Sequence, residues 1–334
     1  MKSDISIKRW RRFKSRKTAV VCSILLLIGV LLTFSAPLIS NSKPLFLYYE
    51  NRMYFPVFFD YHPETFKVDN VLVMNYRKLS LNEKDFAVWT PFKWDPFESN
   101  HAVESYPSPP SAENVLGTDD RGRDIFARLL YGFKYSISYA ILVWFFSFVI
   151  GIVIGGSMGF FGGKVDFLGQ RIVEMFNSIP GFFLLLTLIA TFKPSLFLLV
   201  IFSVLFQWIS ISYYVRGEFL KYRKWEFVEA AQALGVGNKD IIFKHILPNS
   251  MAPIITFTPF TIAGNITALA SLDYLGFGLE VPTPSWGELL AQGQRHFTIG
   301  WWLALFPSLA LFSSLVVLNL IGEGVRDAMD PKLG

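Results

Sequence analysis

Six long apolar stretches constrain the fold of this chain more than any other feature of its sequence. They contain no Asp, Glu, Lys or Arg and cover residues 18–36, 137–158, 176–192, 195–215, 251–272 and 301–321. A helix needs about 20 such residues to cross the roughly 30 Å hydrocarbon core of a bilayer. Of the 334 residues, 52% are hydrophobic and only 17% are charged, which favours lipid as the surrounding medium. The sequence therefore predicts an all-α polytopic membrane protein with six transmembrane helices.

The basic residues flank these stretches and predict the topology. Those before the first stretch are Lys2, Lys8, Arg9, Arg11, Arg12, Lys14, Arg16 and Lys17. By the positive-inside rule the N-terminus lies in the cytoplasm, and six crossings put the C-terminus there too. The basic loop 216–250 is then cytoplasmic, and the segment 37–135 is external by alternation. Because the basic residues are not interleaved with aromatic ones on a soluble surface, the net charge of +5 does not indicate nucleic-acid binding.

The predicted organisation follows from this topology. It consists of a basic cytoplasmic tail (1–17), a first transmembrane helix (18–36), an external module (37–135), a five-helix core (136–322) and a cytoplasmic C-terminal tail (323–334). A cleavable leader is the alternative for the first stretch. That stretch exceeds the usual leader core of roughly 7 to 15 residues, and Phe34 stands where a cleavage site needs a small residue. The single cysteine, Cys22, excludes an intrachain disulfide.

The external segment 37–135 has the aromatic content of a small module with its own core. Aromatic runs at 45–49 and 53–59, interrupted by Asn51 and Pro56, predict short β-strands. The proline-rich run 106–110 predicts extended backbone that leads back to the membrane. We therefore expect a partly β module between the first two transmembrane helices.

A charged turn at 116–124 precedes a helical run that begins at residue 125. Asp119, Asp120 and Asp124 suggest a metal-binding or catalytic carboxylate cluster as one alternative. Arg121 and Arg123 alternate with these acids, however, so ion pairs and an Asp helix cap account for the pattern without a ligand. We favour the second interpretation.

The cytoplasmic loop 216–250 predicts two short helices joined by a turn. On the first helix Phe227, Ala230, Ala231 and Leu234 recur at helical spacing and form one apolar stripe. Gly235 and Gly237 suit positive φ at the turn, Asn238 is a candidate cap for the second helix, and Pro248 is expected to end it. An apolar stripe on a loop too short for a core predicts a cytoplasmic protein partner.

This loop resembles the EAA loop of ABC importer permeases, which docks into a groove on an ATPase subunit. The resemblance rests on Glu229-Ala230-Ala231, on Gly235 and on Leu247-Pro248. His245 stands where that pattern often has Ile, which is typical of the dipeptide and oligopeptide branch. Further segments resemble that branch: 116–124, 159–163, 271–279 and 326–331. Lys43-Pro44, 54–56 and 107–110 resemble branch members with an enlarged first external loop.

The resemblance implies a type I importer permease with a MetI-like core in the bacterial cytoplasmic (inner) membrane. It implies a second permease subunit, two ATPase subunits that bind the ATP, and an external peptide-binding protein. The implied ATPase-coupling residues are Glu229, Ala230, Ala231, Leu234, Gly235, His245, Leu247 and Pro248. The expected substrate is an oligopeptide, modified ones included, with nickel or another small solute as the alternative.

Polar and small residues inside the stretches suggest two further roles. Ser203, Gln207 and Ser210 share one helical face, as do Thr258, Thr261 and Asn265. Polar faces inside lipid look inward, where they line a translocation path or join helices by hydrogen bonds, and the sequence leaves both open. Gly151, Gly155 and Gly159 recur every four residues and predict close helix packing.

Two other classes of protein fit the sequence less well. A secondary transporter usually needs an ionisable relay within its membrane helices, and the six stretches contain no Lys, Arg, Asp or Glu. An enzyme needs a site, yet His62, His101, His245 and His296 are scattered and no hydrolase motif is present. The run 162–165 lacks the pattern of a phosphate-binding loop. We therefore expect no catalytic residue, cofactor or metal site in this chain.

Overall fold

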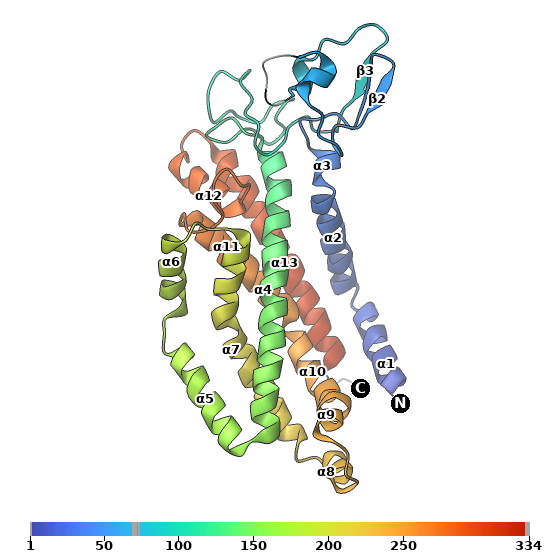
Figure 1. Ribbon diagram of the computed structural model, residues 1–334, viewed down its shortest axis with the longest axis vertical. Coiled ribbons are helices and arrows are strands. Elements are labelled where there is room, and N and C mark those ends of the chain that lie inside the picture. Colours follow the sequence, from blue (N-terminus) through green and yellow to red (C-terminus); the bar gives the residue numbers. More distant parts are fainter. Residues whose placement is uncertain (1, 69–71, 73, 331–334) are drawn as a thin grey trace.

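Four straight helices of the computed structural model are long and apolar enough to cross a membrane. The model describes residues 2–68, 72 and 74–330. The four helices are α2 (Lys17–Phe34), α4 (Ile125–Phe161), α7 (Leu196–Tyr222) and α13 (Trp301–Met329). Figure 1 shows them side by side, with α4 running through the middle of the molecule. The predicted all-α membrane fold is confirmed.

The other two predicted spans are broken helices. The third consists of α5 (Gly163–Asn177) and α6 (Gly181–Thr191), which meet at 66°. The fifth consists of the helical run Asn238–Thr256, which ends in α10 (Leu247–Thr256), and of α11 (Thr258–Tyr274), which meet at 50°. If each bent pair is one span, the described chain has up to six. The predicted third stretch, 176–192, contains the end of α5, the break and α6. Pro180 disfavours helical backbone just before it, so the helix breaks there.

Close contact between α4 and α7 is built on three glycines. A β-carbon at Gly155 would lie only 2.3 Å from the carbonyl oxygen of Ser212, and one at Gly159 would lie 2.5 Å from the β-carbon of Phe219. At Gly151 the nearest atom would be the β-carbon of Ile211, at 2.7 Å. Any larger side chain would push the two backbones apart, so this spacing lets α7 lie directly on α4.

The remaining helices surround this pair. α11 packs against α4 and α13, and α2 packs mainly along α13. Helix α1 (Lys2–Ser15) precedes α2 at one end of the molecule and contacts α13. The short helix α12 (Trp286–Arg295) lies across α11 and α13 at the opposite end. The four-residue helix α3 (Ala36–Ile39) follows α2 at the same end as α12.

The module that follows α3 contains the predicted sheet. Its strands are β1 (Phe46–Tyr49), β2 (Arg52–Tyr54) and β3 (Phe86–Val88), in the antiparallel order β2-β1-β3. Leu47 pairs with Tyr54 on one side and with Ala87 on the other. The strand predicted over 53–59 ends at Tyr54, because Pro56 cannot donate to the ladder. β3 was not predicted.

The core of this module is aromatic, as its composition suggested. Its buried side chains are Leu47, Tyr49, Tyr54, Phe66, Met74 and Tyr76. Phe66 and Tyr76 come from two 3₁₀ turns, η1 (Pro63–Phe66) and η2 (Tyr76–Lys78). Their rings meet edge to face, with the ring centroids 5.6 Å apart. Burial raises the pKa of the Tyr76 phenol to about 12. The module therefore folds around its own core at the end of the molecule opposite α1 (Figure 1).

The glycine contact gives a direct test of the packing. We expect Gly155→Ala to destabilise the protein by about 1 to 3 kcal/mol, because the added methyl group meets backbone atoms of α7 that have no room to move. Gly217→Ala is the matched control, since a β-carbon at Gly217 on α7 meets nothing within 4 Å. Thermal unfolding in detergent compares the two. An equal midpoint for Gly155→Ala and wild type would contradict the close contact.

Candidate functional site

The loop between α7 and α10 forms a compact helical hairpin, residues 226–246, which we call the coupling hairpin. It comprises α8 (Glu226–Ala233), a turn, α9 (Asn238–Asp240) and a π-helical turn, η3 (Ile241–Ile246), that runs directly into α10. Gly235 has φ +75° and begins the turn, as predicted. The amide of Val236 donates to the carbonyl of Ala231 at 3.0 Å and closes the end of α8. Figure 1 shows the hairpin projecting beyond the ends of the long helices.

Three details of this loop differ from expectation. Gly237 has φ −64°, so it needs no left-handed conformation, and its position rather than Asn238 caps α9. Pro248 does not end a helix but lies in the first turn of α10. The π-helical turn before it explains this result. The amide of Leu247 donates to the carbonyl oxygen of Ile242, five residues earlier. The helix is therefore wider just before Pro248, which has no N–H for the regular hydrogen-bond pattern.

One face of the hairpin is buried against the ends of the long helices. Val228, Ala231, Ile241 and Ile246 pack with Phe160 of α4, Val215 and Phe219 of α7, and Ile254 of α10. Ala231 therefore faces inward, which corrects the predicted stripe. The positions of α8 that point away from this core are Phe227, Ala230 and Leu234, the last of which is 83% exposed. Because both 227 and 228 are apolar, the sequence pattern alone does not identify the buried face.

The outward face of the hairpin is small and open. Glu229 and Ala230 are exposed, and a β-carbon at Gly235 or Gly237 would meet nothing within 4 Å. Beside this face the rings of Phe227 and His245 lie 6.4 Å apart. Leu247 is half-buried and Pro248 is exposed at the start of α10. The arrangement is a rigid element, backed by its own core, that presents small side chains outward.

Two arginines tie the base of the hairpin to neighbouring helices. Arg216 on α7 donates to both carboxylate oxygens of Asp166 on α5, at 2.5 and 2.7 Å. Arg223, at the end of α7, donates to the carbonyl oxygen of Phe160 at 3.0 Å. Two-point contacts of this kind fix orientation as well as distance. Movement of the end of α7 is therefore shared with α4 and α5.

A polar layer joins α4, α7 and α11 inside the membrane region. Gln207 donates to the side-chain oxygen of Asn265 at 2.7 Å, and Asn265 donates to the carbonyl oxygen of Ala140 at 3.0 Å. The hydroxyls of Tyr139 and Ser203 are 2.6 Å apart. Of the six inward polar residues predicted from the sequence, these contacts bring together Ser203, Gln207 and Asn265. In this chain alone they hold three helices together.

The other three lie outside this layer. Thr261 bonds to the carbonyl of Phe257 on its own helix at 3.0 Å. Ser210 is exposed and Thr258 is half-buried at the start of α11. Among the described residues, none of these three side chains forms a hydrogen bond with Gln207 or Asn265.

A buried charge cluster, made of Asp119, Arg123, Arg128 and Glu288, joins the charged turn to α12. Arg123 donates to Asp119 at 2.7 Å and to Glu288 at 3.2 Å. Arg128, fully buried on α4, pairs with the second oxygen of Glu288 and lies 3.5 Å from Asp119. Two cations thus meet two carboxylates in a site almost closed to water. Local ion pairs between these acids and arginines were predicted, and Arg123–Asp119 is one such pair. The pair of Arg128 with Glu288 was missed, because 160 residues separate the two.

Backbone groups complete this cluster and fix the turn. Arg128 also donates to the carbonyls of Pro96 and Pro282, at 3.0 and 3.2 Å. Asp124 caps α4 by accepting from the amide of Ala127 at 2.8 Å, as predicted. Burial raises the pKa of the Asp124 carboxyl. Asp120 turns away toward His296, 3.9 Å distant, so the three acids do not converge.

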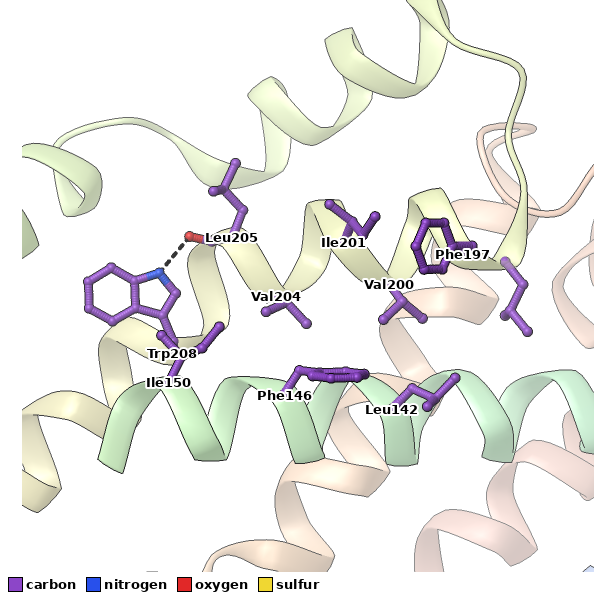
Figure 2. Close-up of a pocket in the computed structure, with 10 residues that line it drawn as sticks. Leu142, Phe146, Ile150, Phe197, Val200, Ile201, Val204, Leu205 and Trp208 are labelled. Carbon is purple, nitrogen blue, oxygen red and sulfur yellow. Dashed lines mark hydrogen bonds between the residues drawn. The ribbon is translucent and has the colours of Figure 1, made fainter. Parts of the chain in front are cut away.

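An apolar groove of about 820 Å³ runs along the outer side of α4 and α7. Figure 2 shows Leu142, Phe146 and Ile150 of α4 facing Val200, Val204 and Trp208 of α7 across it. The indole N–H of Trp208 is already bonded to the carbonyl of Leu205 at 2.9 Å. Such a lining suits lipid chains or an apolar helix and offers little to a polar solute.

The buried charge cluster gives a test of stability. We expect Glu288→Gln to destabilise the protein by about 3 kcal/mol, because it removes the carboxylate that both buried arginines share. Glu280→Gln, at an exposed position in the loop before α12, is the control and should leave the midpoint of thermal unfolding unchanged. If Glu288→Gln unfolds at the wild-type temperature, the cluster does not hold α12 to the charged turn.

Comparisons with known proteins agree with this architecture. Residues 151–334 match the family described as "Binding-protein-dependent transport system inner membrane component". Residues 8–62 match the family described as "N-terminal TM domain of oligopeptide transport permease C". The chain is also similar, at 19% identity and a TM-score of 0.51, to a solved chain of the MetNI methionine ABC transporter, covering 98% of that chain and 62% of this one. That likeness supports the fold.

Curated relatives match over nearly the whole length. The inner membrane ABC transporter permease protein YejE of Escherichia coli is 38% identical and covers 98% of both chains. The peptidoglycan transport system permease protein YejE of Agrobacterium fabrum is 35% identical over 99% of this chain and 94% of its own. The oligopeptide permease OppC of Haemophilus influenzae is 35% identical over 72% of this chain and 75% of its own. The chain therefore belongs to the inner-membrane permeases of binding-protein-dependent ABC importers, in the YejE-like group of the peptide branch.

Proposed function

We propose that this chain is the transmembrane permease subunit of an importer that passes oligopeptides, modified ones included, across the bacterial cytoplasmic membrane. The relatives named above include a peptidoglycan permease and an oligopeptide permease. They favour a peptide over nickel as the solute. The chain itself would bind no ATP and catalyse no reaction. Its work would come from two ATPase subunits, with a second permease beside it and a peptide-binding protein outside.

The coupling hairpin carries this proposal. It has the two properties expected of a docking element. A buried core holds it to α4, α7 and α10, and its open face of small residues fits into a groove on a partner. Glu229 and Ala230 would contact the ATPase, and Gly235 would form the turn. The connection from the hairpin to α10 would be made by His245, Leu247 and Pro248. Ala231 would act from inside by seating α8 on its core.

The proposed mechanism follows the connections of the hairpin. When ATP draws the two ATPase subunits together, each would displace the hairpin held in its groove. α10 follows the hairpin without a break, and only residues 223–225 separate α7 from it, so both would move with it. The Arg216–Asp166 pair would carry the motion to α5, and the Gln207–Asn265 contact would keep α7 and α11 together. The passage would then open to the other side.

The turn residue provides a mutational test. We expect Gly235→Asp to abolish ATP-dependent peptide uptake at normal expression, because φ +75° strains a side chain there and places a charge on the docking face. Gly237→Asp adds the same charge two residues later at φ −64° and should retain more uptake. Uptake into vesicles and peptide-stimulated ATPase activity are the readouts. Wild-type uptake by Gly235→Asp would count against coupling through the hairpin.

The proposed orientation has its own test. The hairpin, α1 and the end of α13 lie at one end of the molecule and the β module at the other (Figure 1). With buried Cys22 replaced by Ala, we expect Lys239→Cys to react with a membrane-impermeant maleimide only in inverted vesicles. Lys84→Cys, on the external module, should react only from the outside of intact spheroplasts. Labelling of Lys239→Cys in intact spheroplasts would contradict a cytoplasmic hairpin.

A further inference from the structure

A second apolar groove lies near the hairpin end of the molecule, between α1, α10 and α13. Its volume is about 350 Å³, and its lining consists of Trp10, Phe13, Ile255, Val325, Ala328 and Met329 together with Arg9. Nearly all of the lining is apolar, with one guanidinium among it. The groove sits just before α2 begins at Lys17, where the chain enters its first span.

The walls of this groove are held in place by specific contacts. Arg16 pairs with Asp327 of α13 at 2.6 Å, and Arg12 donates to the carbonyl oxygen of Asp330 at 3.1 Å. A β-carbon at Gly324 would come within 2.3 Å of the side chain of Ala19, so α2 and α13 touch there. Helix α1 is therefore fixed to the end of α13 rather than loose in solvent, and the groove is part of the fold.

The groove has an excess of positive charge beside it. Within the part of the chain that the structure describes, no acidic side chain forms an ion pair with Lys8, Arg9 or Arg11. The nearby carboxylate of Asp327 is already matched by Arg16. Trp10 is 58% exposed, stacks on Phe13 at 5.8 Å and has the ammonium of Lys14 5.3 Å above its ring. Exposed Trp beside Lys and Arg is typical of a helix at a membrane surface.

We propose that this groove binds an anionic phospholipid of the cytoplasmic leaflet. One acyl chain would lie along Phe13, Val325 and Met329, and the headgroup phosphate would meet Arg9, with Lys8 and Arg11 close by. An apolar lining suits the acyl chain. Lys8, Arg9 and Arg11, which form no ion pair with an acidic side chain among the described residues, suit the charge of the headgroup. This inference rests on the proposed function, because it needs α1 to lie on the cytoplasmic side. Such a lipid would pin α1 and the end of α13 to the bilayer.

The lipid can be counted directly. The permease and its partner permease are reconstituted into nanodiscs that contain phosphatidylglycerol and phosphatidylcholine in equal amounts. After release from the nanodiscs, native mass spectrometry counts the lipid molecules that stay bound to the protein. We expect wild type to retain phosphatidylglycerol at least tenfold over phosphatidylcholine. The triple variant K8Q/R9Q/R11Q should lower that ratio by about tenfold or more, since each cation near a headgroup contributes about fivefold. The matched control R52Q/K78Q/K84Q removes three charges from the external module and should retain the wild-type ratio.

A second pair of variants tests the apolar part of the groove. Val325→Trp fills the groove and should lower phosphatidylglycerol retention, whereas Val316→Trp, at an exposed position higher on α13, should not. Each variant must first purify with its partner at the wild-type yield, so that misfolding is excluded.

Three results would overturn the proposal. The first is equal retention of the two lipids by wild type, and the second is unchanged retention in K8Q/R9Q/R11Q. The third is efficient cross-linking of Val325→Cys to the second permease, which would mean that protein fills the groove. Lipid counting needs neither ATP nor peptide, so its outcome is separate from that of Gly235→Asp. Labelling of the hairpin from outside would instead remove the proposed function, whatever lipid is retained.

Discussion

The contact between α4 and α7 sets the position of every other functional element. Because Gly151, Gly155 and Gly159 have no side chains, the two backbones touch over more than two helical turns, and neither helix can slide without a clash. Above this contact Tyr139 meets Ser203, and below it Phe160 meets Arg223. α4 has 37 residues and is about 55 Å long. The buried charge cluster, the polar layer and the base of the hairpin therefore all contact one continuous helix.

Ion pairs lie at both ends of α4, and the two sets differ in their exposure to water. At the end near α12, Arg128 and Arg123 are buried and share Glu288 and Asp119, which makes removal of one partner costly. At the hairpin end Arg216 and Asp166 are partly open to water. A partly solvated pair contributes less to stability than a buried one. The end near α12 is therefore held together more tightly than the hairpin end.

Local signals in the sequence predicted most of the fold, and distant contacts account for what it missed. The membrane spans, the cap at Asp124 and the turn at Gly235 depend on a few neighbouring residues, so composition and spacing predict them. The inward position of Ala231 depends on α7 and α10, which hydrophobic spacing on α8 does not contain. The partnership of Arg128 with Glu288 depends on α12 returning to α4, and nothing near either residue indicates it.

The two broken spans stand on either side of the straight helix α7 in the chain. α7 contains no proline, is continuous through Gly217 and ends at Tyr222, three residues before the hairpin, whereas α5–α6 bends near Pro180 and α10–α11 bends at Phe257. A bend leaves backbone groups outside the regular ladder, so the angle there changes more easily than within an intact helix. In the proposed mechanism a displacement of the hairpin would be transmitted through α7, and the two bends would take up the change in angle. The α5–α6 bend precedes α7 and the α10–α11 bend follows the hairpin, so α6 and α11 would reorient while each stays helical.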